Sequence, residues 1–99
     1  MIVRLLRRAT KDLHDIGEYI ARDNPARAAS FLAELMARIN GLSTMAESYP
    51  YAGLRQYPHL RRRTHRGYSV YYAVNATLQR VDVHRIVHQS RDIARIFSG

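Results

Sequence analysis

Six arginine and histidine side chains have the chemistry and spacing to act on a phosphate group or an acidic partner: Arg61, Arg63, His65, Arg85, His88 and Arg91. The first three alternate along a predicted strand, which places them on one face. The other three lie in and just after the last predicted strand, and they share a surface with the first three if those strands are neighbours. Arginine binds phosphate in two-point geometry, and histidine moves a proton near neutral pH. The set fits a metal-free ribonuclease, in which the RNA 2′-OH is the nucleophile, or docking of an acidic protein.

Metal and thiol chemistry are not predicted. The chain has no cysteine, which excludes disulfides, zinc–thiolate sites and thiol nucleophiles. His84 and His88 share one face of a predicted strand, but they would stand about 13 Å apart, too far to hold one metal ion. Motifs for nucleotide phosphates, zinc proteases and serine hydrolases are absent. We therefore predict no metal and no cofactor, and any catalysis would be arginine–histidine chemistry.

Hydrophobic periodicity predicts the elements that position these side chains. A strand over 2–7 is followed by a helix capped at Thr10, and a second helix runs from Pro25 to about Met45 behind an Asn24 cap. Three strands and a short last helix, capped by Ser90, complete the chain: 60–65, 68–74, 80–87 and 91–97. The order β-α-α-β-β-β-α predicts one α+β domain over residues 1–99, a helical hairpin packed on a small antiparallel sheet that includes the first strand.

Alternation along the predicted strands assigns side chains to faces. Arg66-Gly67 is a predicted hairpin turn. Period two puts Arg85 on the same face as the valines of the last strand: Val81, Val83 and Val87. Tyr68 and Tyr72 are predicted to lie in the core, whereas Tyr71 takes the opposite face and could stack on a base.

The positive charge is concentrated in the second half of the chain. The 99 residues carry a formal net charge of +8. Seven basic and five acidic residues give +2 in 1–45, whereas nine basic and three acidic residues give +6 in 46–99. This asymmetry predicts a polyanionic or acidic partner. Because no apolar run is long enough for a signal peptide or a membrane span, we expect a cytoplasmic protein without membrane contact.

Seven short fragments follow one another in a characteristic order over nearly the whole chain. They are Asp12-Leu13 with Ile16 to Ile20, Ala21 to Pro25, Ala28-Ala29 with Phe31, Pro50 with Gly53, Leu60-Arg61, Gly67 to Val74, and Arg85 to Asp92. In this order the sequence resembles the ParE/RelE superfamily, the toxins of bacterial type II toxin–antitoxin pairs. The resemblance implies a helical hairpin on an antiparallel sheet. It also implies a cognate antitoxin, acidic and partly disordered, that forms a hetero-oligomer with the toxin and silences it.

The superfamily has two activities, and this sequence is more similar to one of them. RelE-like members are mRNA interferases that cleave in the ribosome, whereas ParE-like members poison DNA gyrase. Nuclease relatives often carry an arginine and a C-terminal tyrosine where this chain has Ser69 and Phe97. The ending Val87 to Asp92 is similar to ParE-like proteins, so the resemblance favours gyrase poisoning, with the C-terminal segment in the target-binding surface. The contact residues would be Arg61, Arg63, Arg85, His88 and Arg91.

Two alternatives stay open. In a ribosome-dependent mRNA endonuclease, Arg63 and Arg85 would hold the scissile phosphate, and His65 or His88 would be the acid or base. The protein is an enzyme only in this case. In a non-catalytic binding module, the basic sheet would bind nucleic acid or protein, and binding to phosphate would weaken steeply with salt.

Overall fold

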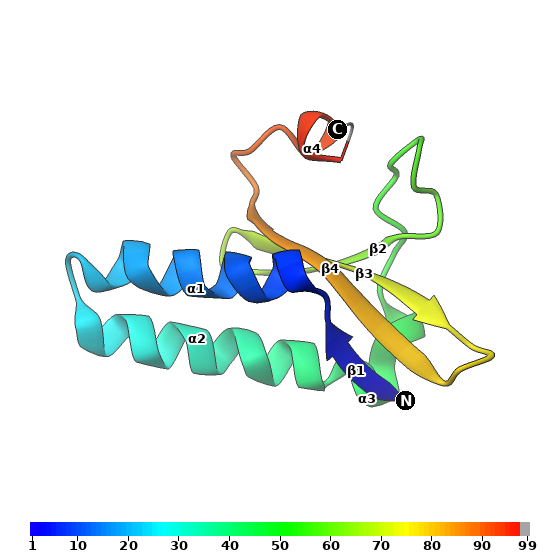
Figure 1. Ribbon diagram of the computed structural model, residues 1–99, viewed down its shortest axis with the longest axis horizontal. Coiled ribbons are helices and arrows are strands. Elements are labelled where there is room, and N and C mark those ends of the chain that lie inside the picture. Colours follow the sequence, from blue (N-terminus) through cyan, green and yellow to red (C-terminus); the bar gives the residue numbers. More distant parts are fainter. Residues whose placement is uncertain (98–99) are drawn as a thin grey trace.

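The chain folds into two layers, a helical hairpin lying on one face of a four-stranded sheet (Figure 1). The structure is a computed structural model and describes residues 1–97. Its elements follow in the order β1 Ile2–Leu5, α1 Arg7–Ala21, α2 Pro25–Asn40, α3 Leu42–Met45, η1 Ala46–Ser48, β2 Arg61–His65, β3 Tyr68–Asn75, β4 Arg80–His88 and α4 Ile93–Ile96. The predicted α+β class is confirmed, and the structure adds the short helix α3 and the 3-10 turn η1 after α2. The predicted sheet is antiparallel except for β1, which pairs with β4 in parallel. None of the helices in the described part is long and apolar enough to cross a membrane.

The sheet has the strand order β1-β4-β3-β2. The last three strands are antiparallel neighbours, and β1 joins the outer edge of β4 as the one parallel pair. The hairpin turn between β2 and β3 is confirmed, because Arg66 and Gly67 have φ of 45° and 85°, the left-handed pair of a two-residue hairpin. Strand β3 therefore separates β2 from β4, and the two strands that carry the candidate site residues are not neighbours.

Tertiary contacts set helix ends that differ from those predicted. Helix α1 begins at Arg7, because the Leu6 N–H already bonds Val83 O at 2.9 Å and fixes the chain direction, so the Thr10 cap is wrong. The Asn24 cap is confirmed by its bond from the Arg27 N–H at 3.0 Å. Helix α2 ends at Asn40, and a separate turn, α3, follows Gly41.

The C-terminal helix is shorter than predicted and has a different cap. Helix α4 covers only Ile93–Ile96, and the side chain of Asp92 accepts from the Arg95 N–H at 3.3 Å. The predicted cap, Ser90, instead bonds the ring of His88. The contact with Ser90 fixes the orientation of the His88 imidazole, which is one of the candidate site residues.

The hydrophobic core lies between the helical hairpin and the inner face of the sheet. Leu35, Ile39 and Tyr72 have no exposed surface, and burial of each large apolar side chain stabilises the fold by about 1.5–3 kcal/mol. The Tyr72 hydroxyl donates to Ala46 O at 2.6 Å, and burial raises the pKa of this phenol to about 12. Tyr72 thereby ties the segment after α3 to the sheet.

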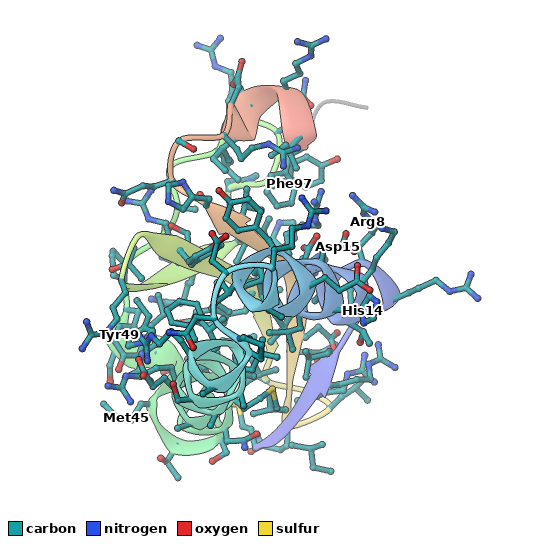
Figure 2. The ribbon with its side chains drawn as sticks, turned by 90° about the vertical axis from the view of Figure 1, so that its left-hand side faces the viewer. Arg8, His14, Asp15, Met45, Tyr49 and Phe97 are labelled. Carbon is teal, nitrogen blue, oxygen red and sulfur yellow. The ribbon has the colours of Figure 1, made fainter. Side chains whose placement is uncertain are left out.

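The opposite face of the sheet is covered by α4 and the loop before β2. Phe97 packs edge-on against Tyr71, with 5.3 Å between ring centroids, and lies 5.5 Å from Tyr57. Figure 2, seen nearly along the hairpin, shows Phe97 below α4 and apart from the two long helices. Tyr71 is only 2% exposed, so the prediction that it is free to stack on a base is wrong.

A β-bulge at His84 changes which side chains of β4 reach the core. Strand β3 pairs Tyr71 with Arg85 and Tyr72 with Val83, which leaves His84 as an extra residue. Beyond the bulge Ile86, rather than Val87, continues the core face formed by the residues at 81 and 83. The prediction that Arg85 and Val87 share a face with Val81 and Val83 is therefore wrong, because period-two counting takes no account of a bulge.

Candidate functional site

The two arginines on the predicted face of β2 are bound to backbone carbonyls. Arg61 Nη1 donates to Tyr49 O at 2.6 Å, and its guanidinium lies 4.1 Å from the centroid of the Tyr51 ring. Arg63 Nη1 donates to Arg38 O at 3.0 Å, in the last turn of α2, and lies 4.6 Å from the Tyr49 ring. A helix C-terminus has carbonyls without partners and a negative dipole end, so a cation there is stabilised. Both arginines therefore connect β2 to the helices and the loop before it.

His65, the third residue of that face, is within hydrogen-bond distance of a carboxylate. Its Nε2 lies 2.9 Å from Glu34 Oε1, and its side chain is 10% exposed. Glu34 also binds Arg27 at 2.5 Å and Arg66 at 3.3 Å. The hydrogen bond from Arg27, followed by that from His65, lowers the pKa of Glu34 to about 2. His65 is therefore a member of a charge cluster between α2 and the β2–β3 turn.

Arg85 is held by a carboxylate from α1. Its Nε and Nη2 donate to the two oxygens of Asp12 at 2.8 and 3.1 Å, and Asp12 also accepts from the Ile86 N–H at 2.9 Å. The Asp12 and Arg85 side chains are 9% and 14% exposed. The contact occurs where β4 extends past its last pairing with β1, Leu5 with Val83. Asp12 thus occupies the open edge of β4 and neutralises Arg85.

A groove of about 870 Å³ lies beside this ion pair, between one face of α1, the β2–β3 turn and the end of β4. We call it the α1–β4 groove. Its lining consists of Arg8, Asp12, Asp15, Ile16, Tyr19, Ile20, Arg27, Phe31, Arg66, Tyr68, Arg85, Ile86, Val87, His88, Ser90 and Arg91. The α1 members recur every three or four residues, as one helix face requires. Of the six candidate residues, the groove collects Arg85, His88 and Arg91, whereas the three on β2 have separate partners.

His88 is oriented by the residues around it. Its Nδ1 lies 2.7 Å from Ser90 Oγ and accepts from the Ser90 N–H at 3.1 Å. In the neutral ring, this acceptor role leaves the proton on Nε2. The ring also packs edge-on against Tyr68, with 5.0 Å between centroids. The imidazole therefore presents a fixed, exposed face at the rim of the groove.

The lining of the groove has a positive surplus, because it holds five arginines and only two aspartates. Asp12 binds Arg85, and Asp15 binds Lys11 at 2.9 Å, which also lowers the pKa of Asp15. Within residues 1–97, the side chains of Arg8 and Arg91 form no ion pair. Figure 2 shows Arg8 and Asp15 on the same side of α1, away from Tyr49. The two arginines are thus available to an anionic partner.

Sequence reasoning missed several groove residues and the pairing of Asp12. Nothing in the sequence near Asp12 indicates a partner 73 residues away. The spacing of Arg8, Asp12, Asp15 and Tyr19 could have indicated a shared helix face. Among the described residues, no group of three or more His, Cys, Asp or Glu side chains could hold a metal ion.

The helical hairpin and the mixed four-stranded sheet define a small two-layer α+β protein, and comparisons with known proteins identify its family. A family model described as "ParE toxin of type II toxin-antitoxin system, parDE" matches residues 3–93. The chain therefore belongs to the ParE family, the toxins of type II toxin–antitoxin systems. No individually curated protein sequence matches it.

Two solved structures with a similar fold come from toxin–antitoxin systems. A chain of the chromosomal ParDE system from P. aeruginosa superposes with a TM-score of 0.76 at 19% identity, covering 89% of this chain and 95% of that one. A chain of the RelBE2 toxin–antitoxin complex from Mycobacterium tuberculosis gives a TM-score of 0.68 at 20% identity, covering 88% and 95%. At these identities the likeness establishes the fold and does not identify the cellular target.

Proposed function

We propose that this ParE-family toxin inhibits growth by poisoning DNA gyrase in the cytoplasm and is silenced by a cognate, acidic antitoxin. The antitoxin is supported by family membership and by the two similar structures, which come from toxin–antitoxin systems. The choice of gyrase rests mainly on one observation. The arginine and histidine side chains needed for RNA cleavage are divided between separate structural contacts on either side of β3.

RNA cleavage requires a base within hydrogen-bond reach of the 2′-OH and cations at the same scissile phosphate. Arg63 instead bonds a helix carbonyl and stacks on Tyr49, and His65 is mostly buried against Glu34. Arg85 lies across β3 and is neutralised by Asp12. This division favours a toxin that acts by binding.

The two positions at which the chain departs from nuclease relatives point the same way. Ser69 is only 3% exposed. Phe97, which has no hydroxyl, packs against Tyr71 and Tyr57. A packed ring and a buried hydroxyl offer no group to a scissile phosphate, which again supports binding to gyrase over cleavage of mRNA.

The accessible candidates for target contact are His88 and Arg91, both exposed at the end of β4. Arg61, Arg63 and Arg85 act mainly by holding the surface in shape. This surface continues into α4, so the C-terminal segment and the end of β4 form one candidate contact region for gyrase.

The experiment compares two targets with the same preparation of toxin. Purified protein is titrated into a gyrase supercoiling and DNA-cleavage assay, and in parallel into a cell-free translation reaction with mRNA cleavage mapped. We expect loss of supercoiling and accumulation of cleaved DNA at micromolar toxin, with mRNA intact. Arrest of translation with cleaved mRNA, while gyrase is unaffected, would contradict the proposal and establish the nuclease.

A further inference from the structure

We infer that His88 is a fixed hydrogen-bond donor to the target: Ser90 holds the ring in the tautomer that carries its proton on Nε2, and this N–H binds a carboxylate or phosphate oxygen. Ser90 is then a positioning residue, which acts through the imidazole. The inference rests on the proposed function, since it takes the exposed end of β4 to be the surface that binds gyrase. The geometry of the ring is a property of this chain alone.

Two groups of Ser90 meet the same nitrogen of the His88 ring. The Ser90 N–H donates to Nδ1 at 3.1 Å, and Oγ lies 2.7 Å from it. A backbone N–H can only donate, so Nδ1 accepts, and the neutral ring carries its proton on the other nitrogen. The partner of one ring nitrogen thus sets the chemistry of the other.

The His88 ring is also fixed by the core and by the turn beneath it. It packs edge-on against Tyr68, with 5.0 Å between centroids. Tyr68 in turn lies 5.4 Å from Phe31, which is 5% exposed in the core. The Gln89 N–H donates to Gly67 O at 2.8 Å and attaches the chain after His88 to the β2–β3 turn. The direction of the Nε2–H bond is therefore set by the fold.

The Nε2 edge of the ring is open because the residue beside it is a glycine. A Cβ at Gly67 would lie 3.4 Å from Nε2, so a larger side chain would cover this nitrogen. Within residues 1–97, Nε2 has no hydrogen-bond partner, and His88 is exposed. Arg66 and Arg91, both exposed, line the same groove as His88. Their charge favours an anionic oxygen as the acceptor of the Nε2–H bond.

This arrangement makes the neutral His88 ring unsuited to act as a general base. A base needs a nitrogen with a free lone pair within reach of the proton that it removes. The lone pair of Nδ1 is bound by Ser90, and Nε2 carries the proton. The ring thus offers a donor and no free acceptor, which agrees with a residue that binds and does not cleave.

The test compares two substitutions that each keep one half of the hydrogen bonding of the ring. In His88→Gln the amide N–H reaches the place of Nε2, whereas in His88→Asn the shorter amide reaches only the place of Nδ1. Ser90→Ala removes the hydroxyl, and Ser90→Thr retains it. Gln89→Ala is the matched control, because Gln89 is exposed and holds the turn through its backbone N–H.

Each folded protein is measured in three ways. Gyrase supercoiling and growth arrest after induced expression report activity. Nitrogen-15 NMR of the imidazole at about pH 8.5, where an unperturbed ring is neutral, reports the tautomer. A role in stability alone would leave the tautomer unchanged and would not separate His88→Gln from His88→Asn.

We expect the wild-type ring to carry its proton on Nε2. Inhibition by His88→Gln should stay within about threefold of the wild type, whereas His88→Asn should be at least about tenfold weaker. Ser90→Ala should weaken inhibition about fivefold and reduce the population of the Nε2–H tautomer, and Ser90→Thr should restore both. Gln89→Ala should match the wild type.

The source of the acceptor oxygen is decided by binding of labelled toxin to gyrase with and without duplex DNA. A difference between His88→Gln and His88→Asn without DNA identifies a carboxylate of the protein, and a difference only with DNA identifies a phosphate. No difference under either condition overturns the inference.

A proton on Nδ1 in the wild type would also overturn the inference, as would equal growth arrest by His88→Gln and His88→Asn. Cleaved mRNA with the wild type and intact mRNA with His88→Gln would make His88 a base instead. Growth arrest does not depend on which target is inhibited. If the wild type arrests growth without inhibiting gyrase, the gyrase proposal fails, while the paired His88 variants still decide the role of the Nε2–H donor.

Discussion

Strand β2 and the end of β4 carry the same kinds of side chain and use them differently. On β2, Arg61, Arg63 and His65 each bind a carbonyl or a carboxylate of the protein itself. At the end of β4, Arg85 is held by Asp12, whereas His88, oriented by Ser90, and Arg91 are exposed. Basic side chains of the same type are thus bound within the protein in one region of the sheet and exposed at its surface in another. The partner of each side chain separates these roles.

The largest stability effect is expected at the Asp12–Arg85 pair, which joins α1 to β4. Asp12→Ala leaves the Arg85 guanidinium and the Ile86 N–H without their acceptor in a site that is about nine-tenths buried. Breaking such a pair typically costs about 3–5 kcal/mol. Chemical denaturation of Asp12→Ala, Arg85→Ala and the double variant measures the coupling. A loss under about 1 kcal/mol for Asp12→Ala would mean that the pair is not structural.

A smaller loss is expected on β2. Arg63→Ala removes the hydrogen bond to the α2 carbonyl and the contact with the Tyr49 ring, which should destabilise the fold by about 1–3 kcal/mol. Gyrase inhibition per folded molecule should remain. Urea unfolding combined with the supercoiling assay checks both, and Arg62→Ala is the exposed control on the same strand. If Arg63→Ala keeps the stability of the wild type but no longer inhibits gyrase, Arg63 contacts the target and is not a structural residue.

The Glu34 cluster predicts a pH dependence of stability. Because Arg27 and His65 lower the pKa of Glu34 in the folded protein from its usual value of 4.5 to about 2, the stabilising contribution of its carboxylate is full above about pH 4.5 and is lost as the pH falls towards 2. Glu34→Gln should flatten the stability profile in this window. Equal slopes for wild type and Glu34→Gln, measured by thermal unfolding between pH 2 and 5, would contradict the assignment.

The smallest stability effect is expected at the end of β4. His88→Ala and Arg91→Ala remove exposed side chains, so unfolding free energies should change by less than about 0.5 kcal/mol. Thermal unfolding of the two variants beside Arg63→Ala measures this directly. A loss of more than about 1 kcal/mol in Arg91→Ala would show that this arginine is structural as well.

Most of the architecture could be predicted from the sequence, because helix caps and tight turns depend on residues that are close together in the chain. The Asn24-Pro25 start of α2 and the Arg66-Gly67 turn are local, and both are found in the structure. The start of α1 and the bulge at His84 depend on contacts with distant strands. Local pattern therefore misplaced the Thr10 cap and the face of Val87.

The candidate site was less predictable for the same reason. Alternation grouped Arg61, Arg63 and His65 on one face, but the strand order places β3 between them and Arg85. No pattern of residue types shows that Asp12 reaches the edge of β4. Strand order and long-range ion pairs are properties of the tertiary structure. They determine which basic side chains are bound within the protein and which are exposed to a partner.

The central claim, that this toxin binds gyrase through the end of β4, is tested most directly by gyrase supercoiling with three matched proteins. Wild type, Arg91→Glu and Arg63→Ala are titrated at equal folded concentration. We predict inhibition by wild type and by Arg63→Ala, with Arg91→Glu at least about tenfold weaker. Inhibition that survives in Arg91→Glu and disappears in Arg63→Ala, or no inhibition by wild type, would contradict the claim.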